Sequence, residues 1–206
     1  MANIKTNREE LLQNAFRLFV RMNYEKASYT ELTKATGLSK AGICHYYPSK
    51  QELFIAVVDK YLLNVHDPRN KFVQNKGTLI EFIDNYVEGV QKALLRYFEL
   101  IGKTNIPGQL SANADYYHFL SQVVRYYPNA QKKMKEFTDQ DYAYWRAAVQ
   151  RAVKSGELKA GTDVEEAIVV FRQVYFGLSF EMSFFCGLDT ELLRRHLHYI
   201  YSLLKA

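Results

Sequence analysis

The chain of 206 residues contains only 2 cysteines, 4 prolines and 10 glycines. Cys44 and Cys186 lie far apart in the sequence and form no C-x-x-C pair, which suits a reducing cytoplasm and offers no cysteine framework for zinc. Because few prolines and glycines interrupt the chain, we expect long helices. The first ten residues, MANIKTNREE, lack an apolar run, which argues against a secretion signal and favours a cytoplasmic location.

The sequence also lacks the common catalytic motifs. It has no G-x-S-x-G, no P-loop and no H-E-x-x-H. His196 and His198 are two positions apart, so on a helix they point to different faces, which argues against shared metal ligation. Lone histidines such as His66 and His118 are interpreted first as ordinary surface or core residues. We therefore expect no enzymatic activity, no cofactor and no metal.

Positive charge is concentrated near the N-terminus. Residues 1–50 contain eight lysines and arginines and only four acidic residues, all glutamates, so most of the formal net charge of +5 lies in this quarter of the chain. A basic head on a nearly neutral body is typical of proteins that bind polyanions. Lysines scattered over a solvated face would give the same balance, so the charge supports a function without identifying it.

The same region has the sequence form of a helix-turn-helix. Ser28 and Glu31 predict a capping box at the start of a short helix, and Gly37 predicts its end. Ser39 is a second good N-cap. The helix after it is expected to run from residue 40 to residue 46 or 47, where the following proline stops it. Two short helices joined by a glycine-containing turn are the usual form of this DNA-binding motif.

The second helix of the motif presents a face suited to DNA. Ile43 and Tyr47 are four positions apart and are expected to anchor one side to the core. The residues left facing outward are Lys40, Ala41, Cys44 and His45. Small residues at the start of such a helix let its backbone approach base edges, while lysine and histidine can donate to bases or phosphates. A surface turn between two packing helices has the same pattern, and this alternative stays open.

Two longer stretches extend the motif: AFRLFVRMNYEKAS at residues 15–28 and GLSKAGICHYYPSKQELF at residues 37–54. With them, residues 8–60 resemble the tetracycline-repressor (TetR-like) family of bacterial transcription regulators. The second stretch is long and highly specific for that pattern. The resemblance implies a DNA-binding head followed by a helical body that dimerises and contains a ligand cavity.

The resemblance also implies roles for individual residues. Those expected to face bases are Lys40, Ala41, Gly42 and His45, those expected to hold phosphates are Tyr29, Thr30, Tyr46 and Lys50, and Ser39 and Cys44 complete the surface. Cys44 stands where the family usually has a tyrosine that reaches DNA, and Gly42 where many members have threonine. Sequence recognition is therefore expected to depend on Lys40, His45 and DNA shape.

The hydrophobic spacing predicts an all-α fold in three parts. These are a helix-turn-helix head at residues 1–48, a connecting helix at 49–66 and a regulatory body at 67–206. Polar residues 67–77 are the expected boundary between head and body. Further helices are expected at residues 78–103, 112–127, 128 or 129 to 155, 167–185 and 190–204, with a break at 104–108 and a stop at Gly156.

The last two helices predict a dimer interface. Residues 167–185 are apolar on nearly every side, so we expect this helix to be buried on every side. A membrane span is the alternative, but charged residues near its middle would be costly there. Two such helices from each of two subunits would form a four-helix interface. The expected interface residues are Gly177, Phe180, Phe184, Leu193, Leu197, Ile200 and Leu204, with Arg194, Arg195 and Lys205 outside the stripe.

The body is rich in aromatic residues, which suit a pocket for an apolar or aromatic small molecule. The candidate ligand-binding residues are Tyr86, Phe98, Tyr116, His118, Trp145, Arg172, Tyr175 and Phe176, with Gln173 and Glu181 as further polar candidates. A buried charge needs a partner, which for Arg172 and Glu181 is either the ligand or the dimer interface. Ordinary core packing explains any single aromatic residue equally well.

Together these features predict a homodimeric repressor that binds a palindromic double-stranded DNA operator and is released by a small-molecule effector. The connecting helix is the expected lever, because it touches both head and body. Two alternatives stay open. One is a DNA-binding regulator that answers to a protein partner or to none, and the other is a helical enzyme or binding module with a vestigial head.

Overall fold

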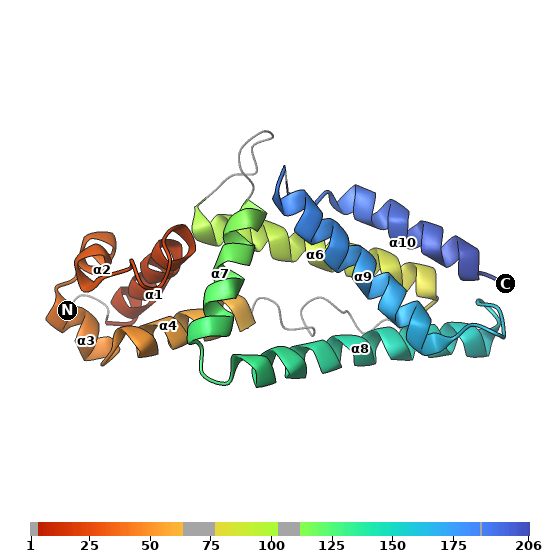
Figure 1. The fold of residues 1–206 in the computed structure, drawn as a ribbon, viewed down its shortest axis with the longest axis horizontal. Coiled ribbons are helices and arrows are strands. Elements are labelled where there is room, and N and C mark those ends of the chain that lie inside the picture. The colour runs from red at the N-terminus through yellow and green to blue at the C-terminus, as the bar shows by residue number, and fades with distance from the viewer. Residues whose placement is uncertain (1–3, 64–76, 103–111, 186) are drawn as a thin grey trace.

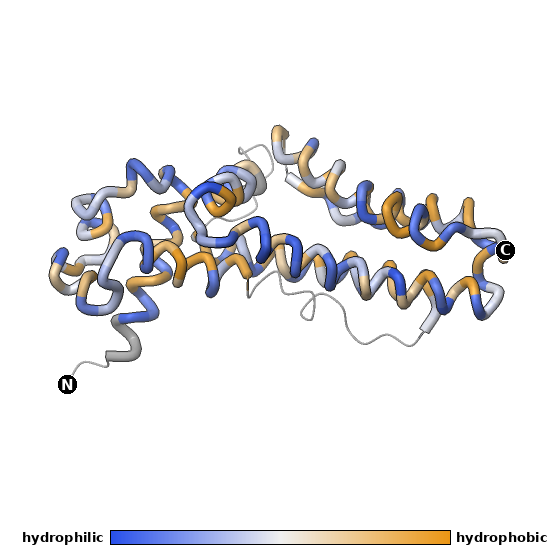
Figure 2. The backbone as a smooth tube through the Cα atoms, turned by 60° about the horizontal axis from the view of Figure 1, so that its bottom comes forward, coloured by the Kyte–Doolittle hydropathy of each residue, from blue (hydrophilic) through white to orange (hydrophobic). Residues whose placement is uncertain are grey.

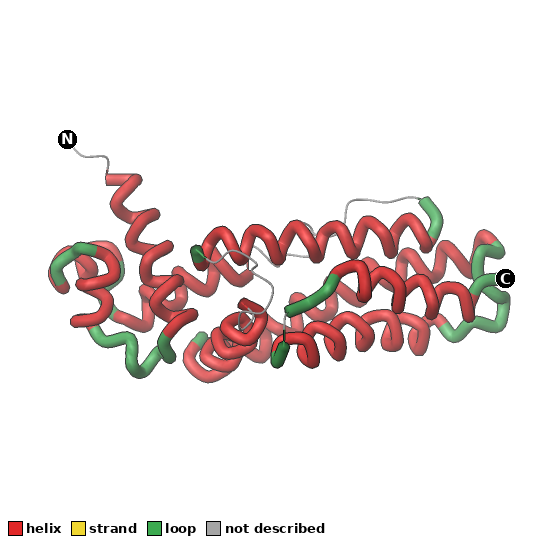
Figure 3. The backbone as a smooth tube through the Cα atoms, turned by 90° about the horizontal axis from the view of Figure 1, so that it is seen from above, coloured by secondary structure: helices red, strands yellow, loops and turns green. Residues whose placement is uncertain are grey.

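The computed structural model describes residues 4–63, 77–102, 112–185 and 187–206. Within these ranges the chain consists of helices and turns and contains no strand, which confirms the all-α prediction (Figure 3). The molecule is elongated. The head lies at one end, long helices form the body at the other, and α7 (Ala112–Tyr126) crosses between them (Figure 1).

The head contains α1 (Ile4–Arg21), α2 (Tyr29–Thr36), α3 (Lys40–Tyr46) and α4 (Lys50–Val58), which runs into a π-helical turn, η1 (Asp59–Leu63). The body contains α6 (Leu79–Ile101), α7 (Ala112–Tyr126), α8 (Ala130–Ser155), α9 (Val164–Ser183) and α10 (Thr190–Leu204). The expected boundary at residues 67–77 and the break at 104–108 lie outside the described residues, apart from Gly77.

The core of the head continues into the body. Phe16 of α1 and Phe54 of α4 are fully buried, and both rings pack edge-on against Phe119 of α7, with centroids 5.4 and 5.9 Å away. Buried apolar side chains at the end of α6 join the same cluster. The head is therefore held against α7 by shared hydrophobic burial, which is the largest favourable contribution to folding.

Capping residues set the helix ends of the head nearly as the sequence predicts. The Ser28 side chain accepts the Glu31 backbone N–H at 3.3 Å, and Gly37 ends α2 at φ 70°. The reciprocal half of the predicted capping box is wrong. The Glu31 carboxylate pairs with Lys34 at 2.9 Å, while the Ser28 N–H donates to the Lys26 carbonyl. A complete capping box lies elsewhere, between Thr78 and Glu81 at the start of α6.

The connecting helix differs from the regular helix expected at residues 50–66. It is α-helical to Val58 and then widens into the π-helical turn η1, while residues 64–66 lie outside the described residues. A π-turn inserts one extra residue into the helical register. Tyr61 and Leu62 are buried there, and the residues of α4 after its polar first turn are hydrophobic (Figure 2).

Helix α9 starts at Val164, three residues before the expected position, because the Asp163 carboxylate caps the backbone N–H groups of Glu165 and Glu166 at 3.0 and 3.1 Å. The prediction that this helix is buried on every side included a second subunit, so the single chain does not test it. Its outer side exposes Val170, Phe176 and Phe180, among others. Within the described ranges, no helix has the length and apolar character needed to cross a bilayer.

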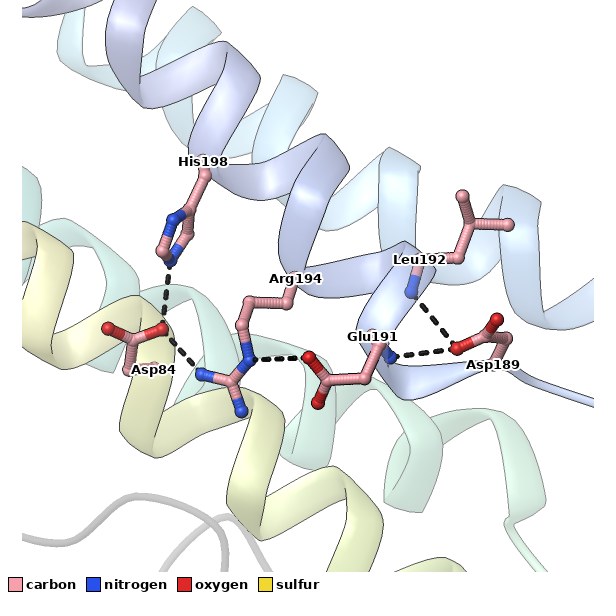
Figure 4. A network of polar contacts seen from close by, with 6 residues as sticks. All are labelled: Asp84, Asp189, Glu191, Leu192, Arg194 and His198. Carbon is pink, nitrogen blue, oxygen red and sulfur yellow. Dashed lines mark hydrogen bonds and ion pairs between the residues drawn. The ribbon is translucent and has the colours of Figure 1, made fainter.

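Polar contacts fasten α10 to α6. The Asp84 carboxylate of α6 accepts hydrogen bonds from Arg194 and His198 of α10, the latter at 2.8 Å, and Arg194 also pairs with Glu191 (Figure 4). Arg194 was expected on the outer side of α10, but it lies half-buried against α6. This arrangement fixes which face of α10 points into the body.

Candidate functional site

The second helix of the motif, α3, is anchored by its inner side. Ser39 caps it by accepting the Gly42 backbone N–H at 3.1 Å, and Ile43 and Tyr47 are buried in the head core, as the spacing predicts. Arg8 of α1 donates to the Tyr47 hydroxyl at 3.1 Å. Because one side is held in this way, the opposite side of α3 faces outward.

The predicted DNA-contacting residues gather on this outer side and on the start of α2. Lys40, Ala41, His45, Thr30 and Ser39 are exposed, and the half-buried members are Tyr29, Gly42, Cys44, Tyr46 and Lys50. Two contacts join α3 to the start of α2: Lys40 Nζ lies 5.0 Å from the ring centre of Tyr29, and the Cys44 thiol lies 3.7 Å from the Tyr29 hydroxyl. Whether these residues contact DNA stays a prediction.

The surroundings of Tyr29 and Gly42 show what each can contribute to this surface. Burial, followed by the hydrogen bond with Cys44, raises the pKa of the Tyr29 hydroxyl, so it stays a neutral hydrogen-bonding group. A Cβ built on Gly42 would lie 3.4 Å from the Ser39 Oγ and 3.6 Å from the Leu38 Cβ, which is ordinary contact. Packing therefore does not require glycine at residue 42.

Lys50 is less available than the sequence suggests. Its ammonium donates to the Tyr24 backbone carbonyl at 2.9 Å and lies 4.3 Å above the Tyr24 ring. Burial lowers the pKa of Lys50, and the nearby charge of Glu25 partly opposes this shift. An ammonium has three donors, so the bond to Tyr24 leaves others for a phosphate. Sequence reasoning did not single out Tyr24, and nothing local to it signals this contact.

A cavity of about 180 Å³ lies in the body between η1, α6, α7, α8 and α9. Its lining residues are Leu62, Leu63, Tyr86, Tyr116, Leu120, Met134, Phe137, Thr138, Asp141, Arg172, Tyr175 and Phe176. Five of the eight predicted ligand-binding residues are among them. The four lining residues from α8 recur at intervals of three and four, the spacing of one helical face. The sequence could show that they share a face, but not that this face lines a cavity.

The other three predicted ligand-binding residues do not line the cavity. Trp145 is completely buried and stacks on Phe171 at 5.2 Å, so it lies in the core behind the wall. Phe98 packs against the head core, and His118 is exposed. Aromatic composition predicted a cavity, but it could not separate wall residues from the packing behind them.

Arg172 has its charge partner within the chain. Its Nε donates to the Asp141 Oδ2 at 2.5 Å, which corrects the expectation that Arg172 needs a ligand or a second subunit as counter-ion. Gln173 and Glu181 are exposed, so neither is a buried polar group of the cavity. Among the described residues, no three His, Cys, Asp or Glu side chains lie close enough together to bind a metal ion.

The comparisons with known proteins agree with this geometry. Residues 11–57 match the model of the bacterial regulatory proteins of the tetR family. The HTH-type transcriptional repressor AcnR of Corynebacterium glutamicum is 39% identical over 51 residues, and the match spans 25% of this chain and 27% of AcnR. The head of this chain is therefore similar to the DNA-binding region of tetR-family regulators.

Solved structures extend the likeness to the whole TetR-like fold. The repressor MexZ of Pseudomonas aeruginosa superposes with a TM-score of 0.69 at 17% identity, over 98% of this chain and 96% of MexZ. A transcriptional regulator of Saccharomonospora viridis, solved in complex with choline, gives a TM-score of 0.67 at 18% identity, over 97% of each chain. At such identities the likeness concerns the fold.

The surface of the TetR-like body differs from the predicted dimer stripe on α10. Gly177, Phe180 and Phe184 are exposed, as an interface requires. Leu193 and Leu197 are fully buried in the core with α6, so the prediction that they meet a second subunit is wrong, and Ile200 and Leu204 are half-buried against the same core. The stripe packs inward because its leucines and the apolar side chains of α6 bury one another. Its exposed apolar residues are Tyr199 and Leu203.

Proposed function

We propose that this chain is a DNA-binding transcriptional regulator, a homodimeric repressor that recognises an operator through α3 and releases it when a small molecule occupies the body cavity. The observation that carries the proposal is the outward face of α3, anchored on one side and open on the other, in a head that matches the tetR family. The match to AcnR spans about a quarter of either protein, so it supports the function of the head.

The chemistry of α3 supports recognition in the major groove. Lys40 and His45 are exposed and can donate to base edges, while Ala41 and Gly42 let the backbone come close. No acidic side chain lies within α3, so the helix presents only neutral or positive groups to the phosphates. We propose that Tyr29, Thr30 and Tyr46 bind the phosphates beside it, and that Lys50 does so through its remaining donors.

The outer side of α9 and α10 supports dimerisation. Phe180, Phe184, Tyr199 and Leu203 are 52 to 65% exposed, which is costly for large apolar side chains gathered on neighbouring helices. Covering this side with a second copy would bury them and relate two recognition helices by one two-fold axis. Such a pair reads both half-sites when the helices lie about 34 to 36 Å apart.

The π-turn η1 supports a link between ligand and head. Leu62 and Leu63 line the cavity, while Tyr61 stacks on Phe16 of α1 at 4.8 Å and Lys60 pairs with Glu9 at 2.6 Å. A ligand that displaces the two leucines would therefore shift the head relative to the body. Couplings of this kind are typically about 1 to 3 kcal/mol, enough to release an operator. The choline complex of the Saccharomonospora viridis protein supports a small molecule as effector.

The test is a selection of bound DNA from a random pool, followed by footprinting of the enriched sequence with and without metabolite extract. A palindromic site, protected by the protein and released by a fraction of the extract, is the expected result. Protection that no small-molecule fraction changes would favour the alternative, a regulator that answers to a protein partner or to none. Failure to enrich any sequence would refute the proposal.

A further inference from the structure

We infer that the body cavity selects a small organic cation, an amine or quaternary ammonium with an apolar or aromatic group, and that Asp141 is its counter-ion. The inference deepens the proposed function by naming the charge and size of the effector, and it rests on that function only for the biological role. The binding itself is a property of the cavity and can be measured without DNA.

The walls of the cavity favour positive charge. The described lining includes five aromatic side chains, whose ring faces carry negative electrostatic potential and attract cations. The protein already uses this property, since the guanidinium carbon of Arg172 lies 3.8 Å from the ring centre of Tyr142 and 5.3 Å from that of Phe176. A desolvated cation gains more from such rings than an exposed one.

Asp141 provides the negative charge. Its hydrogen bond with Arg172 uses one carboxylate oxygen, whereas a carboxylate offers about four acceptor positions on two oxygens. Its side chain is 18% exposed, against 5% for Arg172, so the carboxylate is the more accessible member of the pair. Burial, with a further contribution from the charge of Asp141, raises the pKa of Tyr86 and of Tyr175, so both phenols stay neutral in the wall.

An anion would meet unfavourable groups in the same place. The Arg172 guanidinium lies close to the rings of Tyr142 and Phe176 and is nearly buried, so an anion would have to compete with Asp141 for it. Asp141 would also repel the incoming charge, because like charges in a partly desolvated site are screened poorly by salt. Because Asp141 is the more exposed member of the pair, the site favours a cation over an anion.

The volume gives the size of a group that the walls can surround. A dry cavity of about 150 Å³ in another protein binds benzene. The cavity of about 180 Å³ in this chain is slightly larger, which suits one ring with a small cationic group. Phenyltrimethylammonium is a suitable probe, because tert-butylbenzene is its neutral isostere and benzoate supplies a ring with a negative charge.

The experiment measures binding of these three probes to the purified full-length chain by calorimetry and by fluorescence. Trp145 is the single tryptophan, and its ring lies 5.1 Å from that of Tyr86 in the cavity wall, so its emission should report occupancy. We expect the cation to bind at least about tenfold more tightly than its neutral isostere, and benzoate to bind most weakly. Equal or tighter binding of the neutral or anionic probe would overturn the inference.

Variants locate the effect. Asp141→Asn should reduce the affinity for the cation about tenfold or more and leave the neutral probe unchanged. Asp84→Asn is the matched control, because Asp84 also pairs with an arginine in the body but does not line the cavity. If Asp141→Asn unfolds because Arg172 is left unpaired, the double variant Asp141→Asn with Arg172→Gln keeps a neutral pair. An equal loss for both probes would overturn the role of Asp141.

The rings are tested separately from the hydroxyls. Tyr175→Phe retains the ring and should keep the preference for the cation, whereas Tyr175→Leu should reduce it. A DNA-release assay then separates the two proposals. If the cation binds but does not release DNA, the effector role is refuted and the assignment of the cavity is retained. If the protein binds its operator but the three probes bind the cavity equally well, only the assignment of the cavity is refuted.

Discussion

Arg172 of α9 and Asp141 of α8 form an ion pair of 2.5 Å inside the body, although they lie 31 positions apart in the sequence. Arg172→Met leaves the partly buried carboxylate of Asp141 without its partner. We expect a loss of roughly 2 to 4 kcal/mol in the free energy of unfolding. This is somewhat below the usual cost of breaking a buried ion pair, because the Asp141 side chain is partly exposed to solvent. Urea denaturation measures it. Adding Asp141→Leu should restore much of the loss, and no restoration would contradict this account.

Lys40 and His45 are the expected leading contacts to bases. Replacing either with alanine should weaken specific DNA binding by roughly 1 to 3 kcal/mol, because each can hydrogen-bond to a base edge, and should leave the fold intact. Footprinting and circular dichroism measure the two effects. Lys92→Ala removes an exposed charge from α6 in the body and serves as control. An unchanged footprint for both head variants would refute their role.

Lys50 tests the phosphate contacts. Lys50→Met should reduce the slope of log affinity against log salt by about one unit, since one fewer counter-ion is released on binding. Because its ammonium also bonds to the Tyr24 carbonyl, some loss of head stability should accompany the change. The measurement is a salt titration of operator binding. An unaltered slope would mean that Lys50 holds only the loop at Tyr24 and does not contact DNA.

Gly177 tests the proposed dimer surface. Gly177 is exposed and a Cβ at this position meets nothing within 4 Å in the single chain, so Gly177→Arg should not disturb the fold of the monomer. Across a two-fold interface it would bury an unpaired charge, so we expect monomers in light scattering and loss of operator binding. Gly161→Arg is the matched control, because that site is equally open but lies in the loop before α9. A Gly177→Arg protein that stays dimeric would count against this surface.

Tyr127 gives a pH-dependent prediction. Burial, together with its 2.7 Å hydrogen bond to Asp59 of η1, raises the pKa of Tyr127 from 10.0 to about 12. Since the folded-state pKa is the higher one, the resulting stability is fully present below pH 10.0 and is lost as the pH rises through about 12. Other buried tyrosines titrate in both proteins, so the informative quantity is the difference between wild type and Tyr127→Phe.

Denaturation across this pH range measures that difference. The stability of Tyr127→Phe should fall less steeply than that of the wild type above pH 10, because the variant has no phenol to ionise there. Tyr199→Phe, at an exposed position on α10, serves as control and should follow the wild type. Parallel curves for Tyr127→Phe and the wild type would contradict the assigned shift.

The helix-turn-helix could be predicted almost residue by residue because its signals are local. Ser39 caps α3 and Gly37 ends α2, and each acts through backbone groups within a few positions. The cavity could be predicted only in part. Tyr86 and Tyr175 were found from composition, but Asp141 was missed, because its role arises from a contact with a distant helix.

The sequence by itself determined the helices, their caps and the presence of an exposed basic face on α3, since periodicity and capping depend on neighbours a few residues apart. Tertiary structure decided which apolar face packs inward. Leu193 and Leu197 form an apolar stripe that suits either α6 or a second subunit, and packing against α6 buried them in their own chain. A hydrophobic pattern predicts that a face of a helix is buried. Which element buries that face depends on how all the helices are arranged in space.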